Sequence, residues 1–240
     1  MIEVSALRRH FGKTEVLKGI TFKAEPGKVT GLLGPNGAGK TTTIKIISTI
    51  LKPHGGDVVV NGYSIKSDPK KVRSQIGVVF EESNIYARLT GEENILYFAE
   101  LADVPHDEAH RRMERFFDLL GVDYASKLAG TYSKGMMQKI NLIRSIIHNP
   151  PVVILDEPTN GLDVPSSRAV ETFIREMKEE GKTILLSTHL MAQVEKLCDY
   201  IYIIHQGKIV EEGTPDSIKE KYGTTTVEDA FLKVVSTHVE

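Results

Sequence analysis

The sequence has 240 residues, of which 40% are hydrophobic and 26% charged, an ordinary composition for a globular protein of one large domain or two small ones. A formal net charge of −2 gives no general reason to expect nucleic acid, and the single cysteine, Cys198, excludes an internal disulfide framework. No apolar run approaches the roughly 20 residues of a membrane span, and the amino-terminal residues lack a signal-peptide core, so the chain is expected to be cytoplasmic and to reach a membrane only through a partner.

Alternating apolar and polar residues, and short apolar runs bounded by turn residues, predict strands over residues 2–9, 15–24, 28–34, 56–62 and 75–80. A helix is expected over residues 41–51, with Pro53 ending it. Strand signals then vanish, and helical spacing predicts helices over 91–102, 106–122 and 134–149. Strands and helices alternate again over 151–158, 166–181, 182–188 and 190–198, followed by a hairpin over 200–213. This order predicts an α/β core interrupted by an inserted helical segment.

The stretch "GPNGAGKTT" lies between the predicted strand at 28–34 and the helix that follows it. The glycines Gly34, Gly37 and Gly39 allow successive backbone N–H groups to point into one concavity. The start of the helix and the Lys40 ammonium also favour an anion there, and Thr41 offers a hydroxyl to Mg²⁺ bound to the same phosphates. Together these features predict a nucleotide-phosphate site.

Two adjacent acids, Asp156 and Glu157, end the apolar strand predicted in "PVVILDEP". Carboxylates are costly at such a buried position unless a cation or a proton accompanies them. Asp156 is therefore predicted to hold Mg²⁺ and Glu157 to polarise an attacking water. His189 follows the next strand, at the carboxyl end where α/β folds bind ligands. Two interpretations of His189 stay open: a functional role at this site, or an ordinary structural role.

The stretch "TYSKGMMQK" precedes a predicted helix. Ser133 and Gly135 could offer a hydroxyl, backbone N–H groups and a helix N-terminus to phosphate. The alternative is that Ser133 is a plain helix N-cap. In "PTNGLD", the residues predict a tight turn that leaves Asp163 exposed.

With these motifs in this order, the chain resembles the nucleotide-binding subunit of an ATP-binding cassette (ABC) transporter over residues 2–222. The resemblance implies a P-loop NTPase core with an N-terminal antiparallel β subdomain and an inserted α-helical subdomain. It implies one ABC ATPase domain over 1–222, with its core at 1–81 and 150–222 and its helical subdomain at 82–149, followed by a helical tail at 223–240. The form "YSKGM" and the tail "VEDAFLKVV" resemble the ABC-2 type exporter branch.

The resemblance also implies ATP and Mg²⁺ as ligands. It implies that Phe11 stacks on adenine, although an edge-strand packing role stays open, and that Glu81 stands where the family has a metal-coupling glutamine. Magnesium would be held by Thr41, Glu81 and Asp156, and catalysis would fall to Glu157 and His189. The implied nucleotide-binding residues are Phe11, Gly34, Pro35, Asn36, Gly37, Ala38, Gly39, Lys40, Thr41, Thr42, Ser133, Gly135 and Asp163.

The sequence departs from the family pattern at three positions. Glu81 replaces the glutamine. In "YSKGMMQ", which resembles the family signature, Lys134 replaces the first glycine, and Met136 replaces the glutamine that follows the second glycine. The phosphate contact of the signature is expected to survive through Ser133 and Gly135. The strength and asymmetry of that contact depend on these replacements.

The function implied is ATP binding and hydrolysis that power transport, in the direction of export, through integral membrane permease subunits. A second nucleotide-binding subunit is expected as a partner, in a homodimer or a heterodimer, and the chain is expected at the inner face of the cell membrane. A cassette ATPase acting on DNA or ribosomes would need a coiled-coil insertion, tandem cassettes or basic tracts, which the sequence lacks. A cassette ATPase that acts in assembly or regulation without a permease stays open as the alternative.

The carboxyl-terminal residues predict one more helix. Thr226 and Asp229 have the spacing of a capping box, and Val227, Ala230, Phe231 and Val234 form one apolar stripe. About three turns of isolated helix are marginal in water, so the stripe must pack on something. Two surfaces stay open as the one that the stripe packs on: the body of the same subunit, or a partner subunit.

Overall fold

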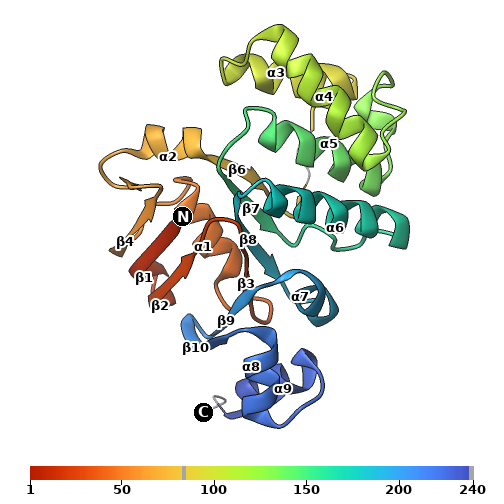
Figure 1. The fold of residues 1–240 in the computed structure, drawn as a ribbon. Coiled ribbons are helices and arrows are strands. Elements are labelled where there is room, and N and C mark those ends of the chain that lie inside the picture. Colours follow the sequence, from red (N-terminus) through yellow and green to blue (C-terminus); the bar gives the residue numbers. More distant parts are fainter. Residues whose placement is uncertain (83–84, 238–240) are drawn as a thin grey trace.

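A computed structural model of the chain describes residues 1–82 and 85–237, and its two β-sheets are covered by helices (Figure 1). The antiparallel sheet has the order β2-β1-β4-β5. Its strands are β1 (Ile2–Phe11), β2 (Thr14–Ala24), β4 (Gly55–Val60) and β5 (Tyr63–Ser64). This sheet is the expected N-terminal antiparallel subdomain.

The second sheet has the order β10-β9-β3-β8-β7-β6 and is parallel except for β10. Its strands are β3 (Val29–Leu33), β6 (Ile76–Val79), β7 (Val152–Asp156), β8 (Thr183–Thr188), β9 (Tyr200–His205) and β10 (Lys208–Gly213). Strands β3, β7 and β8 are buried along their whole length, which explains their continuous apolar runs.

The two faces of this sheet belong to two different hydrophobic clusters. Side chains such as Leu32 and Ile154 pack with helix α1 (Lys40–Ile47), which lies between the two sheets. Their neighbours Leu33 and Leu155 point to the opposite face and pack with α5 (Lys134–Ile146), α6 (Val164–Glu179) and α7 (Met191–Leu197). The alternation of strand side chains therefore fixes which helices cover which face.

The inserted helical segment lies between β6 and β7, which pair directly, so the chain leaves and re-enters the sheet at neighbouring strands. The segment contains α3 (Gly91–Leu101), α4 (His106–Leu120), the short helix η1 (Ala129–Thr131) and α5, seen at the top of Figure 1. Thr90 and Glu93 form a capping box that begins α3, and Gly121 ends α4 in a left-handed conformation. The predicted fold class is confirmed.

Several predicted helix limits were wrong. Helix α1 ends at Ile47, well before Pro53, because Thr49 takes a φ of 63° and the Ser48 hydroxyl donates to the carbonyl of Ile44 at 2.8 Å. Helix α6 begins two residues earlier than predicted because Asp163 caps it. The sequence patterns also missed α2 (Pro69–Gln75) and α8 (Pro215–Tyr222), whose first helical residue is a proline.

The tail helix α9 (Val227–Thr237) packs on α7 and α8 of the same chain. Val227, Ala230 and Val234 are fully buried there, and the backbone N–H of Val227 donates to the Glu195 carboxylate at 2.6 Å. In contrast, Leu232 on the same helix is 60% exposed. Within the described residues, the apolar stripe is therefore covered by its own subunit.

This packing predicts a contrast between two neighbouring substitutions on α9. Val234→Asp should lower Tm by about 5 °C or more, because it buries a carboxylate where a methyl pair was packed. Leu232→Asp should change Tm by less than about 2 °C, because that side chain is in solvent. Thermal unfolding followed by circular dichroism measures both. Equal losses for the two variants would contradict the prediction, because they would mean that the face carrying Leu232 is also covered. Dissociation of an oligomer on deleting residues 224–240 would instead place a partner subunit on α9.

Candidate functional site

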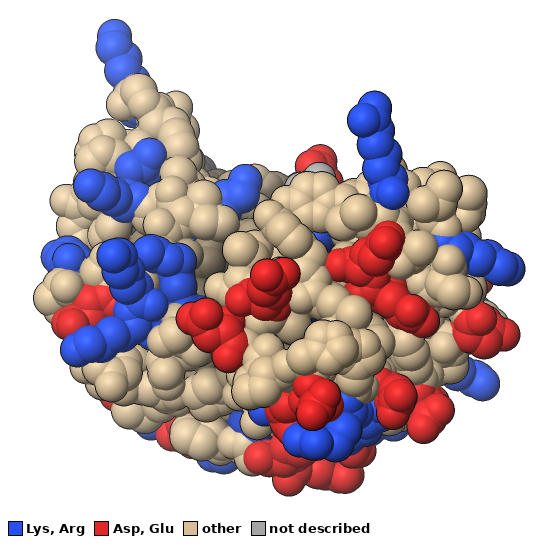
Figure 2. Space-filling model, turned by 90° about the horizontal axis from the view of Figure 1, so that it is seen from above, with Lys and Arg blue, Asp and Glu red and all other residues tan. Residues whose placement is uncertain are grey.

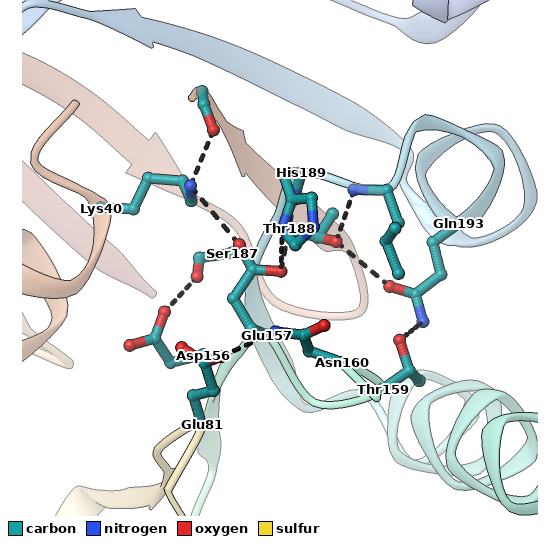
Figure 3. A network of polar contacts seen from close by, with 12 residues as sticks. Lys40, Glu81, Asp156, Glu157, Thr159, Asn160, Ser187, Thr188, His189 and Gln193 are labelled. Atoms are coloured by element: carbon teal, nitrogen blue, oxygen red, sulfur yellow. Dashed lines mark hydrogen bonds and ion pairs between the residues drawn. The ribbon is translucent and has the colours of Figure 1, made fainter. Parts of the chain in front are cut away.

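The carboxyl ends of three adjacent strands bring together most of the predicted catalytic residues (Figure 3). Strand β3 leads into the glycine-rich loop and Lys40, and β7 ends at Asp156, directly before Glu157. Between them, β8 ends at Thr188, directly before His189. Residues that are far apart in the sequence therefore meet at the edge where parallel α/β sheets bind ligands.

The glycine-rich loop curls around the Lys40 ammonium. Lys40 Nζ donates to the carbonyl of Gly34 at 2.7 Å and to that of Pro35 at 3.4 Å, and only 6% of the residue is exposed. Gly39 takes a φ of 114°, which an L side chain rarely adopts, and a Cβ at Gly34 would lie 2.3 Å from the carbonyl oxygen of Ile204. The loop thus needs glycine at both positions to place a cation inside a backbone turn that favours anions.

Glu157 stands between two nitrogen-bearing groups. Its Oε1 lies 3.4 Å from Lys40 Nζ, and its Oε2 lies 2.9 Å from His189 Nδ1 and accepts the backbone N–H of His189 at 3.3 Å. Glu157 is 7% exposed, and its Oε1 accepts no hydrogen bond from the described residues. The ion pair with Lys40 compensates the charge but leaves this oxygen with capacity for a further donor such as water.

Asp156 is almost fully buried, and burial raises the pKa of its carboxyl. Hydrogen bonds from the hydroxyls of Ser187 and Thr41 oppose that rise in the pKa. Thr41 lies at the start of α1 and Asp156 at the end of β7, so two oxygen ligands from different elements face one another. A desolvated carboxylate beside a hydroxyl is a donor set that suits a hard divalent cation.

Glu81, the third predicted metal residue, is exposed, and its Oε1 accepts a hydrogen bond from Asn160 Nδ2 at 2.7 Å. Asn160 belongs to the loop that follows Glu157. In this structure Glu81 is therefore tied to that loop, and a ligand role would require it to exchange this contact or to use its other oxygen.

The loop after Glu157 is fixed at three consecutive residues, which the sequence analysis did not find. Gln138 of α5 donates to the carbonyl of Pro158 at 2.9 Å, and Gln193 of α7 donates to the hydroxyl of Thr159 at 2.6 Å. Asn160 donates to Glu81, as described above. The available sequence signal was weak, because each glutamine is one of several polar residues in its helix.

The signature residues Ser133 and Gly135 lie at the start of α5, and Asp163 of the "PTNGLD" turn lies at the start of α6. The Ser133 hydroxyl accepts the backbone N–H of Met136 at 3.3 Å, so Ser133 is the N-cap of α5. Asp163 accepts the backbone N–H of Ser166 at 2.8 Å, and hydrogen bonding by Ser166 lowers the pKa of Asp163. A Cβ at Gly135 would lie 2.3 Å from Ser166 Oγ, which shows how closely the signature approaches α6. No hydrogen bond or ion pair within the described part of the chain joins these residues to Lys40.

Phe11 ends β1 and is 46% exposed. The guanidinium of Arg9 lies 4.7 Å from the centre of its ring. One face of the ring thus has a cation–π partner, and the exposure leaves room for a planar ligand.

Comparisons with known proteins agree with this geometry. A family model described as "ABC transporter" matches residues 17–160, more than half of the chain. The ATP-binding protein NatA of Bacillus subtilis (strain 168) is 39% identical over 230 residues, which cover 94% of each protein. The daunorubicin/doxorubicin resistance ATP-binding protein DrrA of Streptomyces peucetius is 35% identical, over 94% of this chain and 69% of that protein.

Solved structures share the fold. A structure described as the ATP-binding subunit of an ABC transporter superposes with a TM-score of 0.91 at 32% identity, covering 98% of this chain and 99% of that one. A dimeric ATP-binding cassette in a post-hydrolysis state with ADP and Pi has a TM-score of 0.79 at 23% identity, over 89% of this chain and 98% of that one. This second similarity supports the fold alone.

The buried carboxyl of Asp156 predicts an effect on stability without any ligand. Because its pKa is raised in the folded state, the folded chain loses stability as pH rises from the ordinary carboxyl range through that raised pKa. Asp156→Asn should therefore raise Tm at pH 7.5 by about 2–4 °C, and the gain should shrink as the pH approaches 4. Thermal unfolding without metal or nucleotide tests this, with the exposed Asp107→Asn as the control. A lower Tm than that of the native chain at pH 7.5 would contradict it.

Proposed function

Because the chain belongs to the ABC transporter family of ATP-binding subunits, we propose that it binds and hydrolyses ATP to power substrate transport through separate permease subunits. The observation that carries the proposal is the meeting of Lys40, Asp156, Glu157 and His189 at three adjacent strand ends. Relatives described as drug-resistance ATP-binding proteins support export as the direction. They favour this function over a cassette that acts without a permease.

The phosphate chain of ATP would bind at the loop around Lys40. Residues Gly34 to Gly39 would contribute backbone N–H groups, except Pro35, which has none and shapes the turn. The side chains of Lys40, Thr41 and Thr42 would lie at the start of α1, and Phe11 would stack on adenine. An anion entering this loop would give the Lys40 ammonium a stronger partner than the two carbonyl oxygens that it now contacts.

Mg²⁺ would bind beside Thr41 and Asp156, whose oxygens already face one another. Burial of Asp156 disfavours its ionised form, and a bound cation would stabilise that form by its positive charge. Bound Mg²⁺ would neutralise part of the charge on the triphosphate. Glu81 would join the site with its free oxygen or after releasing Asn160.

Glu157 would accept a proton from the water that attacks the γ-phosphorus. The free acceptor capacity of Oε1 suits that task, while His189 holds Oε2 through two contacts and could turn its ring to the γ-phosphate. As the new P–O bond forms, the bond between the γ-phosphorus and the bridging oxygen of ADP breaks. Lys40 would stabilise the charge that develops on the phosphoryl oxygens.

A second nucleotide-binding subunit would complete the site. Ser133, Gly135 and Asp163 lie at helix N-termini with no bond to Lys40 of their own chain, among the described residues. They are therefore suited to meet the nucleotide held by another subunit, and hydrolysis would remove the contacts that hold the two surfaces together. A homodimer and a heterodimer both fit this arrangement.

The permease would dock at a groove between the core and the helical segment. A cavity of about 770 Å³ is lined there by residues that include Ile50, Phe80, Phe98, Leu101 and Arg144. Ile50 and Leu101 are 60% and 65% exposed, so apolar surface on both sides of the groove lacks a partner within the described chain. Docking there would place the subunit at the inner face of the membrane.

The membrane connection is proposed to be indirect. None of the helices in residues 1–82 and 85–237 combines the length and the apolar character that crossing a membrane requires. Nucleic acid is not proposed as a partner, because the formal net charge of the chain is −2. The one face shown in Figure 2 carries both basic and acidic side chains.

The central test is Glu157→Gln. The amide keeps the shape of the side chain but accepts protons poorly, so ATP should still bind while kcat falls by about a hundredfold or more. Release of inorganic phosphate measures turnover, and gel filtration with ATP should show a trapped dimer. Turnover at the native rate would remove Glu157 from its proposed role.

The docking groove is tested by substituting Leu101, which lines the groove, and Leu232, which does not. Leu101→Glu should abolish co-purification with the proposed permease subunit, because a charge would replace an exposed apolar side chain of the groove. Leu232→Glu on α9 is the matched control, since its exposure is similar and it lies away from the groove. Both variants should bind ATP normally. Retained co-purification of Leu101→Glu would place the permease elsewhere.

A further inference from the structure

Gln193 is a buried polar residue to which neither the sequence motifs nor the proposed reaction gives a role. It lies in the first turn of α7 and is 5% exposed. Both ends of its side-chain amide are used: Nε2 donates to Thr159 Oγ1 at 2.6 Å, and Oε1 accepts from Thr188 Oγ1 at 3.3 Å (Figure 3). Such a satisfied amide is held in one orientation by its two hydroxyl partners.

The two hydroxyls belong to the segments that carry the reacting groups. Thr188 directly precedes His189, and its Oγ1 also accepts the backbone N–H of Leu190 at 3.0 Å. The turn that carries His189 is thus closed on Thr188. Thr159 follows Glu157 by two residues, in the loop that is also tied to Gln138 and Glu81.

Gln193 therefore links the same two segments as the Glu157–His189 contact. The direct contact cannot stay unchanged through a reaction in which Glu157 takes a proton and His189 approaches phosphate. The link through Gln193 involves neither group, so it can persist while the direct contact is exchanged. It would keep the two segments at a fixed separation during that exchange.

We propose that Gln193 is a positioning residue, which holds the Glu157 loop against the His189 turn through Thr159 and Thr188. The inference rests on the proposed function, because it assumes that Glu157 and His189 act on ATP. Gln193 itself contacts no reacting atom. Its loss should affect the rate of the chemical step more than the binding of nucleotide.

The test removes the hydrogen bond between Gln193 and Thr159 by changing either residue, with little change in side-chain volume. Gln193→Met and Thr159→Val should each lower kcat by about ten- to a hundredfold, with KM for ATP and Kd for ADP within about twofold of the native values. Thr159→Ser keeps the hydroxyl and should retain kcat within about twofold. The exposed Lys196→Met on the same helix is the control for α7 itself.

A double variant shows whether Gln193 and Thr159 affect kcat through one shared contact or through separate packing effects. The double variant Gln193→Met with Thr159→Val should be no slower than the slower single variant, because both remove one link. The proposal is overturned if kcat per folded molecule stays native in the single variants while only Tm falls. Multiplicative losses in the double variant would also overturn it, since they would mean two independent effects.

Glu157→Gln, measured in the same assay, separates this inference from the proposed function. If Glu157→Gln retains turnover, the proposed function is wrong about its water-activating residue. If Glu157→Gln loses turnover while Gln193→Met and Thr159→Val keep theirs, the proposed function stands and the positioning role of Gln193 fails.

Discussion

The buried contact between Lys40 and Glu157 depends on the strand order of the six-stranded sheet. Strand β8 lies between β3 and β7, so the two chain segments that follow β3 and β7 are about 10 Å apart. Only long side chains can cross that gap, and Lys40 and Glu157 meet above the end of β8 with Nζ and Oε1 3.4 Å apart. Ser187 and Thr188 end β8, and His189 follows them directly. The sheet order therefore decides which side chains can share one ligand.

This arrangement places more buried charge in one region than is favourable for the stability of the folded chain. Asp156 and Glu157 are consecutive acids at the end of an apolar strand, and only Glu157 lies within ion-pair distance of Lys40 among the described residues. Burial of Asp156 and the free acceptor capacity of Glu157 Oε1 are both unfavourable in the absence of a ligand. A triphosphate with its metal would relieve both conditions, so ligand binding would offset these unfavourable terms and stabilise the folded chain.

The fold was largely predictable because each strand of the parallel sheet is a short apolar run and each covering helix has an apolar stripe. The limits that failed depended on single residues, such as Thr49 with its positive φ and Asp163 as a cap. The strand-end residues of the site follow motifs, whereas Gln138 and Gln193 do not. A glutamine looks the same in sequence whether it faces solvent or, like Gln193, bridges Thr159 and Thr188, which lie 29 positions apart in the sequence. The roles of the individual site residues remain predictions.

The insertion of the helical segment between the paired strands β6 and β7 has a consequence for engineering. Because the chain leaves and returns at neighbouring strands, the segment could be exchanged between relatives without altering the sheet. Helix α5 should stay with the recipient, since its Gln138 donates to the carbonyl of Pro158 in the loop that follows Glu157. A graft limited to residues 85–130 would carry α3 and α4 with Leu101 of the groove. Such chimaeras would change which permease is recognised while the host chain keeps its own ATP chemistry.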